Sequence, residues 1–394
     1  MLPETADFVI VGAGVMGTST AFHLASRGAG HVVLLEKDAI GSGSTGRTGG
    51  IIRQHYSNEV TARMAKRSLE VFQNFSKIVG GDAGFTETGA LFIVGERDRK
   101  GLAANVALQQ SVGISTRVVD VETMRELAPY LDLSDDVVAA YEPEAGYADG
   151  TGTATGFAQA AQRHGAEVHQ NVAVTDIIVE GDRVAGVRTT AGDIQARRVA
   201  VTAGPWGGRL LSRIGIDFPL EVSRHQVASV RRPEGVADPH HPVVGDFLHG
   251  YYMRSETGQL TLIGSIEAEE AQNIVAPDDY KLGTDRGFVE EYIERASRRF
   301  PALMDGEIME GWSGLYTVTP DWHPIIDAVT GIEGLFCALG FSGHGFKLGP
   351  VVGEMVADLV AGEQQCPIDS SIFNARRFEE GRLVRGQYEY SIIG

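Results

Sequence analysis

Four residues near the N-terminus have types and spacing that suit a nucleotide ligand. Gly12, Gly14 and Gly17 form the pattern G-x-G-x-x-G, and Glu36 follows at a distance of nineteen residues from Gly17. Such glycines permit a tight turn, a close approach of backbone to a pyrophosphate, and close packing of a helix on a strand. A carboxylate at the position of Glu36 accepts a hydrogen bond from a ribose 2′-hydroxyl. The spacing therefore predicts a dinucleotide site.

The segments around these glycines are the ones that such a site needs. Residues 8–11 are a continuous apolar run typical of a buried strand, residues 18–27 carry apolar side chains at helical spacing, and residues 32–35 form a second apolar run. Strand, glycine turn, helix and strand together make a βαβ unit. The phosphates of the ligand would lie at the positive N-terminal end of the helix.

A second loop, Gly41 to Gly50, bears on which dinucleotide is bound. It consists largely of glycine and hydroxyl side chains and holds one cation, Arg47. Small residues let backbone wrap around a long diphosphate and ring system, which favours FAD over NAD. A flexible surface loop is the alternative interpretation of this segment taken alone. Ser57 is a candidate N-cap for the helix that follows the loop.

A third glycine-rich segment, Gly340 to Gly349, follows the apolar run 335–339 and contains Lys347. We expect Pro350 to open a helix that ends at Gly362. Its N-terminus would lie at the carboxyl end of a strand, where open α/β sheets bind their ligands. The partial positive charge of that helix end would stabilise negative charge on a bound ligand.

Composition limits the classes of protein to consider. The 394 residues correspond to roughly two or three domains, and the net charge of −18 makes nucleic acid a poor partner. Cys337 and Cys366 are too few and too far apart for a disulfide framework or a metal knuckle. The N-terminus lacks the basic segment of a signal peptide, and no apolar stretch is long enough to predict a transmembrane segment. We expect a cytoplasmic protein.

The middle of the chain reads as alternating strands. Residues 88–94 and 221–265 predict one antiparallel sheet made in two instalments, whereas residues 156–164 predict a helix and residues 167–174, 176–180, 184–189 and 199–202 predict strands. The fold class is therefore α/β, with a Rossmann-like dinucleotide-binding domain and a second domain built on a sheet.

Taken together with Gly204-Pro205-Trp206 and with Tyr316 to Asp321, these motifs resemble a known family. It is the FAD-dependent amine oxidoreductases of the D-amino acid oxidase class, especially sarcosine oxidase and the β subunit of its heterotetrameric form. The resemblance extends over nearly the whole chain. It implies an FAD-binding domain assembled from residues 1–84, 145–220 and 311–394, and a substrate domain from residues 85–144 and 221–310.

The resemblance also implies which residues bind FAD. They lie in the glycine motifs and the two loops: Gly12, Gly14, Val15, Met16, Gly17, Glu36, Lys37, Ser44, Thr45, Arg47, Thr48, Gly49, Gly50, Ile51, Val172, Ala203, Gly204, Trp206, Gly343, His344, Gly345, Phe346 and Lys347.

In sarcosine oxidase, cations that match Arg53 and Lys347 hold the substrate carboxylate against the flavin. The resemblance therefore implies a small carboxylated amine as substrate, oxidised at its C–N bond by hydride transfer, with the imine then hydrolysed. The alternatives for these two cations are an ordinary ion pair or a phosphate contact. The further catalytic candidates around the amine are His55, His344, Tyr252 and Tyr316, for which structural hydrogen bonding and packing are the alternatives.

Departures from the family pattern qualify these expectations. Gly314 stands where sarcosine oxidase has the cysteine that links its flavin, Gly150 stands where the β subunit has a histidine for a second flavin, and residues 41–50 lack the histidine that tethers FAD in dimethylglycine dehydrogenases. FAD is therefore expected to bind noncovalently.

Leu262 takes the place of a lysine that speeds the reaction of sarcosine oxidase with oxygen. A dehydrogenase that passes electrons to a quinone, a flavoprotein or a partner subunit is thus favoured over an oxidase, in which Lys347 or a protonated histidine would replace that lysine. Two other functions stay open. One is an FAD-dependent 2-hydroxy acid dehydrogenase, and the other is a non-catalytic flavin-bearing assembly or subunit protein.

Overall fold

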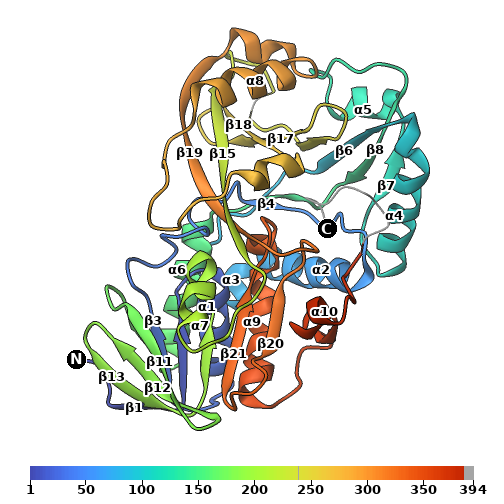
Figure 1. Cartoon of the computed structure of the whole chain (residues 1–394). Coiled ribbons are helices and arrows are strands. Elements are labelled where there is room, and N and C mark those ends of the chain that lie inside the picture. Colours follow the sequence, from blue (N-terminus) through green and yellow to red (C-terminus); the bar gives the residue numbers. More distant parts are fainter. Residues whose placement is uncertain (238, 386–394) are drawn as a thin grey trace.

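The computed structural model describes residues 1–237 and 239–385. These residues form two lobes (Figure 1), one around a six-stranded sheet and the other around an eight-stranded sheet. The six-stranded sheet has the order β10 (Glu167–His169), β3 (Val32–Leu35), β2 (Phe8–Val11), β14 (Val199–Val201), β21 (Leu335–Leu339) and β20 (Ile325–Ala328). Its strands are parallel except β20. This sheet confirms the expected α/β class.

The predicted βαβ unit is present as β2, α1 (Val15–Ser26) and β3. Every residue of both strands is buried, in agreement with their continuous apolar character. Because β2 and β3 are parallel neighbours, the turn between β2 and α1 lies at the carboxyl edge of the sheet.

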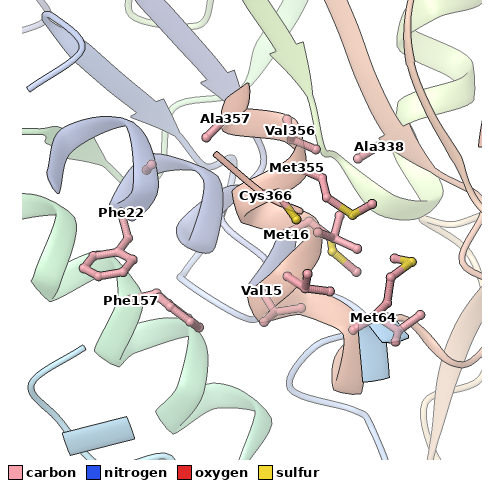
Figure 2. Packing of buried hydrophobic residues seen from close by; sticks show 14 of the residues in the cluster. Val15, Met16, Phe22, Met64, Phe157, Ala338, Met355, Val356, Ala357 and Cys366 are labelled. Atoms are coloured by element: carbon pink, nitrogen blue, oxygen red, sulfur yellow. The ribbon is translucent and has the colours of Figure 1, made fainter. Parts of the chain in front are cut away.

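Helix α1 packs between two other helices, α6 (Gly150–Arg163) and α9 (Gly345–Ala361). Figure 2 shows Phe22 of α1 beside Phe157 of α6, with Val15 and Met16 of α1 near Met355 of α9. The Phe22 and Phe157 ring centroids are 5.6 Å apart. The helix α2 (Glu59–Gln73) and the short α3 (Phe75–Ile78) complete this layer.

Three helix starts differ from the sequence expectations. Asn58, rather than Ser57, caps α2, since its side chain accepts the Thr61 N–H at 2.8 Å. Helix α6 begins at Gly150, six residues before the expected Gly156, because the Asp149 side chain caps it and accepts the Thr151 N–H at 3.0 Å. Because glycine is a poor helix former, the glycines at the start of α6 hid this part of the helix from a prediction based on helix propensity.

The third difference concerns Pro350, which lies inside α9 and does not open it. The helix begins five residues earlier, after His344, and Pro350 leaves the carbonyl of Phe346 without its helical donor. As a result Lys347 belongs to the first turn of the helix. Gly362 ends the helix in the left-handed conformation, at φ +73°, as expected.

The eight-stranded sheet confirms that distant segments build one sheet. Its order is β19 (Glu307–Val318), β15 (Glu221–Arg231), β18 (Leu260–Ser265), β17 (Tyr251–Glu256), β16 (Val243–Asp246), β6 (Ala90–Gly95), β8 (Val137–Glu142) and β7 (Arg117–Val119). The predicted segments 88–94 and 221–265 join through β6 and β16, which pair in parallel although an antiparallel sheet was expected. Strand β19 crosses the expected domain boundary at residue 310, so the division into domains stays a prediction.

Smaller elements complete the fold. A four-stranded sheet consists of β1 (Thr5–Ala6), β13 (Gly192–Ala196), β12 (Arg183–Thr189) and β11 (Val174–Glu180), and a three-stranded sheet of β4 (Ile51–Ile52), β9 (Gly146–Tyr147) and β5 (Thr86–Glu87). The expected strand 167–174 is two strands, β10 and β11, with residues 170–173 between them.

The remaining helices are α4 (Arg99–Ser111), α5 (Val121–Leu127), α7 (Gly207–Ser212), α8 (Arg286–Ser297) and α10 (Arg376–Glu379). Figure 1 shows α8 above the β15–β19 end of the large sheet and α4 beside β7. Within the described ranges, no helix combines the length and the apolar character needed to cross a membrane.

Candidate functional site

A cavity of about 530 Å³ lies where the two lobes meet. Its walls come from the carboxyl ends of β2 and β14, from the Gly41–Gly50 loop, from the turn before α9, and from β15, β17 and β19 of the large sheet. The volume is in the range of small-molecule and cofactor sites. Segments more than 300 residues apart in the chain thus face one ligand space.

The glycine motif forms the floor of one end of this cavity. Gly12 has φ +100°, and a Cβ on it would lie 2.8 Å from Cα of Ala203. Gly12 must therefore stay glycine, whereas a Cβ on Gly14 would make a tight contact of 3.1 Å with Oγ1 of Thr45. Gly17 does not line the cavity; a Cβ on it would lie 1.9 Å from the carbonyl oxygen of Gly12, so it permits the helix to pack on the turn, as predicted.

Glu36 lines the cavity at the end of β3 with a carboxylate held in place by backbone. Its Oε2 atom accepts the N–H of Ala13 at 2.8 Å, and Oε1 accepts the N–H of Asp38 at 2.9 Å. Each oxygen keeps a further lone pair for a ligand hydroxyl. The position fits the predicted ribose contact.

The Gly41–Gly50 loop is held firmly in place, contrary to the alternative of a flexible surface segment. Oγ1 of Thr45 accepts the N–H of Val15 at 3.0 Å, and Oγ of Ser44 donates to the carbonyl of Leu315 at 2.8 Å. Trp312 of β19 donates from Nε1 to the carbonyl of Arg47 at 2.9 Å. The loop is therefore positioned both by α1 and by β19.

The glycine turn before α9 is wedged against β19. Gly343 has φ +88°, and a Cβ on it would lie 2.2 Å from the ring of Tyr316, so only glycine fits there. The N–H of Ser342 donates to the carbonyl of Thr317 at 2.9 Å. This contact aims the first turn of α9, whose amides have no intrahelical acceptors, at the cavity.

Arg53 and Lys347 line the same part of the cavity, although each is more than nine-tenths buried, at 8% and 7% exposure. Burial and the charge of Arg53 hold the pKa of Lys347 well below its usual range. Within residues 1–237 and 239–385, the Lys347 amine has no hydrogen-bond or ion-pair partner. Arg53 donates to the carbonyl of His55 and lies 4.5 Å from the ring centroid of Tyr56.

Two tyrosines and a histidine of the large sheet form a polar part of the cavity wall. The rings of Tyr316 and His225 stack with centroids 3.6 Å apart, and Tyr252 lies alongside. Burial raises the pKa of Tyr252 to about 12 and that of Tyr316 still further, and it lowers the pKa of His225 to about 3. At neutral pH all three are uncharged and suited to hydrogen bonding.

The two predicted histidines differ in placement. His344 lines the cavity, and its Nε2 donates to the carbonyl of Trp322 at 2.7 Å, which leaves Nδ1 unprotonated. Burial and Lys347 hold the pKa of His344 well below its usual range. His55 does not line the cavity, because its ring stacks behind Phe92 with centroids 4.5 Å apart. Direct contact between His55 and a ligand is therefore not supported.

The remaining predicted cofactor residues fall into two groups. Those that line the cavity are Val15, Met16, Lys37, Ser44, Thr45, Arg47, Thr48, Gly49, Gly50, Ile51, Ala203, Gly204, Trp206, Gly345 and Phe346. Val172 does not; its N–H donates to the carbonyl of Glu36 at 2.8 Å and so supports that strand end. Leu262 also lies outside the lining, buried in β18 opposite Arg254.

Sequence reasoning missed several lining residues of the large sheet and its loops. Phe92, His225, Gln226, Phe247 and Ile266 contribute to the wall. They lie on β6 and β15 or beside β16 and β18, where side chains alternate between the two faces of a sheet. The alternation was visible in the sequence, but the face that would meet the cavity was not.

Comparisons with known proteins agree with this geometry. A family model described as FAD dependent oxidoreductase matches residues 7–359. The chain is 30% identical over 388 residues to the mitochondrial sarcosine dehydrogenase of Mus musculus, covering 96% of this chain and 42% of that protein. It is 27% identical over 392 residues to the sarcosine oxidase subunit beta of Rhodobacter capsulatus, covering 96% and 90% respectively.

A solved structure is similar over its full length. The L-proline dehydrogenase from P. horikoshii has a TM-score of 0.88 and 31% identity, covering 97% of this chain and 100% of that chain. By contrast, this chain spans about two fifths of the length of the sarcosine dehydrogenase. The matched region includes the glycine cradle, Glu36 and the two helix ends, which fit a diphosphate, a ribose and an electron-accepting ring. The chain therefore belongs to the FAD-dependent oxidoreductases of the D-amino acid oxidase class, and its cofactor is FAD.

Proposed function

We propose that this protein oxidises the C–N bond of a small carboxylated secondary amine, either an N-alkyl amino acid or a cyclic imino acid. The observation that carries the proposal is the pair Arg53 and Lys347. Arg53 and Lys347 are buried basic groups beside one cavity, and Lys347 has no anionic partner in the described ranges, so a bound anion would stabilise the positively charged form of the pair. A carboxylate supplies that anion through charge-assisted hydrogen bonds.

The proposed position of FAD follows from the walls of the cavity. Gly12 and Gly14 with the first turn of α1 would hold the diphosphate, Glu36 the ribose, and the first turn of α9 the ring. Gly314 offers no side chain for a covalent link, and a Cβ there would already lie 3.2 Å from Cβ of Arg47. We infer that the cofactor is held noncovalently.

When bound, FAD supplies the hydride acceptor for the carbon next to the substrate nitrogen, and water hydrolyses the resulting imine. The residues of the chain would orient the substrate. Arg53 and Lys347 hold the carboxylate, which fixes the position of the neighbouring carbon and nitrogen. Tyr252 and Tyr316 keep their protons at neutral pH, so they donate hydrogen bonds and do not accept a proton from the ammonium. The amine must be neutral to react, because only an unprotonated nitrogen has the lone pair that drives hydride transfer from the neighbouring carbon.

The test is an anaerobic reduction of the FAD-loaded protein, followed by flavin absorbance. Sarcosine, L-proline, D-alanine and 2-hydroxyglutarate are mixed separately with the protein. We expect rapid bleaching by at least one of the secondary amines, with a rate that rises from pH 7 to pH 9 as the neutral amine becomes more abundant.

Other outcomes separate the alternatives. Bleaching by 2-hydroxyglutarate alone would assign the cavity to a 2-hydroxy acid. Bound FAD that no ligand of the panel reduces would support a non-catalytic flavin-bearing subunit. A rate that is flat between pH 7 and pH 9 would contradict the requirement for a neutral amine.

The electron acceptor and assembly are part of the same proposal. A relative that this chain matches over 90% of its length is named as a subunit of sarcosine oxidase, which supports a role as one subunit of a larger oxidoreductase. We propose that a quinone, a flavoprotein or a partner subunit receives the electrons, with oxygen as the competing acceptor.

A further inference from the structure

A fully buried carboxylate, Glu142, lies at the end of β8 against the peptide that follows Arg53. Its Oε2 atom accepts the N–H of Gln54 at 2.8 Å. Its Oε1 atom has no hydrogen-bond donor in residues 1–237 and 239–385, and the nearby Nδ1 atom of His55 is 3.8 Å away. An ionised carboxylate with a buried, unsatisfied oxygen is unfavourable, so the charge of Glu142 depends strongly on its surroundings.

The neighbours of Glu142 limit what can compensate its charge. Gln109 of α4 donates from Nε2 to Nδ1 of His55 at 3.2 Å, so this nitrogen accepts and offers no proton to Glu142. Burial lowers the pKa of His55 to about 3 and raises the pKa of Tyr56 to about 12, so both are uncharged at neutral pH. The charged groups that act on Glu142 are Arg53 and Glu144.

Opposing influences leave the charged and neutral forms of the Glu142 carboxyl nearly equal in free energy at neutral pH. Burial, as the largest cause, and Glu144 raise its pKa, whereas the Gln54 N–H and the charge of Arg53 lower it, with a resulting value of about 7. A second negative charge placed on Arg53 would weaken the attraction that keeps Glu142 ionised. A carboxylate outside the cavity lining therefore already interacts electrostatically with Arg53 before any ligand binds.

We propose that Glu142 is a positioning residue that gains a proton when a ligand carboxylate binds to the carboxylate clamp, which is the pair Arg53 and Lys347. In the empty enzyme Glu142 is ionised and serves as counter-charge to Arg53. This inference rests on the proposed function, since it needs a carboxylate at Arg53 and Lys347. In the step, one proton from solvent adds to a Glu142 oxygen and no other bond changes. Ligand binding is thereby coupled to proton uptake.

Lys347 faces the same clamp and must be separated from Glu142. Its pKa is held well below the usual range, and a bound carboxylate would raise it, so Lys347 would also take up a proton on binding. Glu142→Gln removes only the contribution of Glu142, because glutamine keeps an oxygen that accepts the Gln54 N–H but does not titrate. The difference between the two proteins isolates Glu142.

The experiment measures proton uptake with the full chain loaded with FAD. The ligand is pyrrole-2-carboxylate, which has a carboxylate but no amine that titrates near neutral pH. Isothermal titration calorimetry at pH 6 and pH 8, in buffers of different ionisation enthalpy, gives the number of protons bound, and flavin absorbance gives Kd independently. We expect proton uptake at pH 8 and a Kd that rises above pH 7, by at most tenfold per pH unit for each proton.

At pH 8, the Glu142→Gln variant should take up as much as one proton fewer than the parent does. Its Kd should also rise less steeply with pH. At pH 6, where Glu142 already carries its proton, its Kd should stay within about twofold of the parent value. Glu144→Gln is the matched control and should still take up protons on binding, because Glu142 is intact. A merely structural role of Glu142 would weaken binding equally at both pH values.

The outcomes distinguish the two levels of the proposal. If the parent binds no pyrrole-2-carboxylate at pH 6, the clamp and with it the proposed function are wrong. If the parent binds it but Glu142→Gln takes up as many protons as the parent, the assignment to Glu142 alone is overturned. Should Glu142→Gln lose FAD, Glu142→Asp decides: a titrating carboxyl remains, so loss of proton uptake in this variant also overturns the assignment.

Discussion

At the scale of single residues, the site combines cations with groups that burial keeps neutral. Arg53 and Lys347 lie beside the uncharged Tyr252, Tyr316 and His225. Such a wall attracts an anion without offering a strong base. We therefore propose that selectivity for a carboxylate and tolerance of a neutral amine both follow from this one arrangement.

The first prediction concerns this pair of cations. Arg53→Ala and Lys347→Ala should each leave FAD bound and weaken a carboxylated substrate by about 1.5 to 3 kcal/mol, which is the scale of one hydrogen bond to a charged group. The measurement is the anaerobic Kd for L-proline or sarcosine from flavin reduction. Prolinamide, which lacks the carboxylate, is the matched ligand and should be affected little. Unchanged constants in both variants would show that the clamp is misassigned.

A second prediction follows from a buried histidine outside the cavity. His241 shares hydrogen bonds with the Pro242 carbonyl and with Thr261, and burial lowers its pKa to about 3. As the pH falls, the unfolded state protonates His241 near pH 6.5, whereas the folded state does so only near pH 3. The stability contributed by neutral His241 is therefore complete above about pH 6.5 and is lost as the pH falls towards 3.

Thermal unfolding between pH 7 and pH 4 tests this expectation. The free energy of unfolding of the parent should fall with decreasing pH by up to about 1.4 kcal/mol per pH unit for each such histidine. His241→Asn, whose amide can still donate to the Pro242 carbonyl, should show a slope smaller by one proton. An identical slope in parent and variant would contradict the assignment.

At the scale of elements, the close packing of α1 against α9 fixes the position of the two helix ends that face the cavity. A Cβ on Gly353 would lie 2.1 Å from Oγ of Ser19, and one on Gly349 would lie 2.4 Å from Cγ2 of Val15. Both helices direct their first turns at the cavity, so their spacing fixes the distance between the two helix ends. The glycines of α9 thus contribute to the site although most do not line it.

The third prediction tests this packing. Gly353→Ala should destabilise the protein by about 1 to 3 kcal/mol, because the added methyl group overpacks the contact with α1. Gly287→Ala on α8 is the matched control, since its Cβ would meet nothing within 4 Å and alanine is the better helix former. Its stability should stay equal or rise by up to about 1 kcal/mol. Thermal unfolding of both variants with saturating FAD makes the comparison.

The elements that could be predicted from the sequence are those with one strong local pattern. The βαβ unit of residues 8–35 has uninterrupted apolar strands and a spaced glycine motif, and the structure matches it closely. Helices α6 and α9 were misjudged at their starts, because Gly150 and Gly345 are poor helix formers whose conformation depends on Asp149 and on the contact with β19. Tertiary packing decided these starts, and a local reading does not contain it.

The candidate site shows the same division. Residues in glycine motifs, such as Glu36 and Lys347, could be placed from the sequence because a motif fixes their position relative to the backbone. Phe92 and His225 could not, since their sheet is assembled from segments far apart in the chain. His55 illustrates the opposite error: it lies two residues after the cavity-lining Arg53, outside any helix or strand, and the ring of Phe92 separates it from the cavity.

At the scale of the whole molecule, the open question is where the electrons leave. Leu262 lies outside the cavity lining, so it marks no position at the ring from which a lysine could act on oxygen. The cation that does lie beside the ring end, Lys347, has its pKa held low and would be engaged by the substrate carboxylate. We therefore expect that neither position 262 nor Lys347 supplies a fixed charge that speeds the reaction with oxygen.

The fourth prediction is that the reduced enzyme reacts slowly with oxygen. In stopped-flow mixing with air-saturated buffer, reoxidation should be slower than steady-state turnover measured with a soluble quinone or dye as acceptor. The same preparation, mixed with the quinone, provides the control. Reoxidation by oxygen at the rate of turnover would instead identify an oxidase.

The order of strands in the six-stranded sheet also constrains biosynthesis. Strand β21 pairs with β14, and α9 packs on α1, yet α9 is made more than three hundred residues after α1. On the ribosome, helix α1 therefore waits for more than three hundred residues before its neighbour α9 is made. Until then α1 exposes the apolar surface that α9 will cover, so we expect the nascent chain to need chaperones and truncations before residue 335 to aggregate.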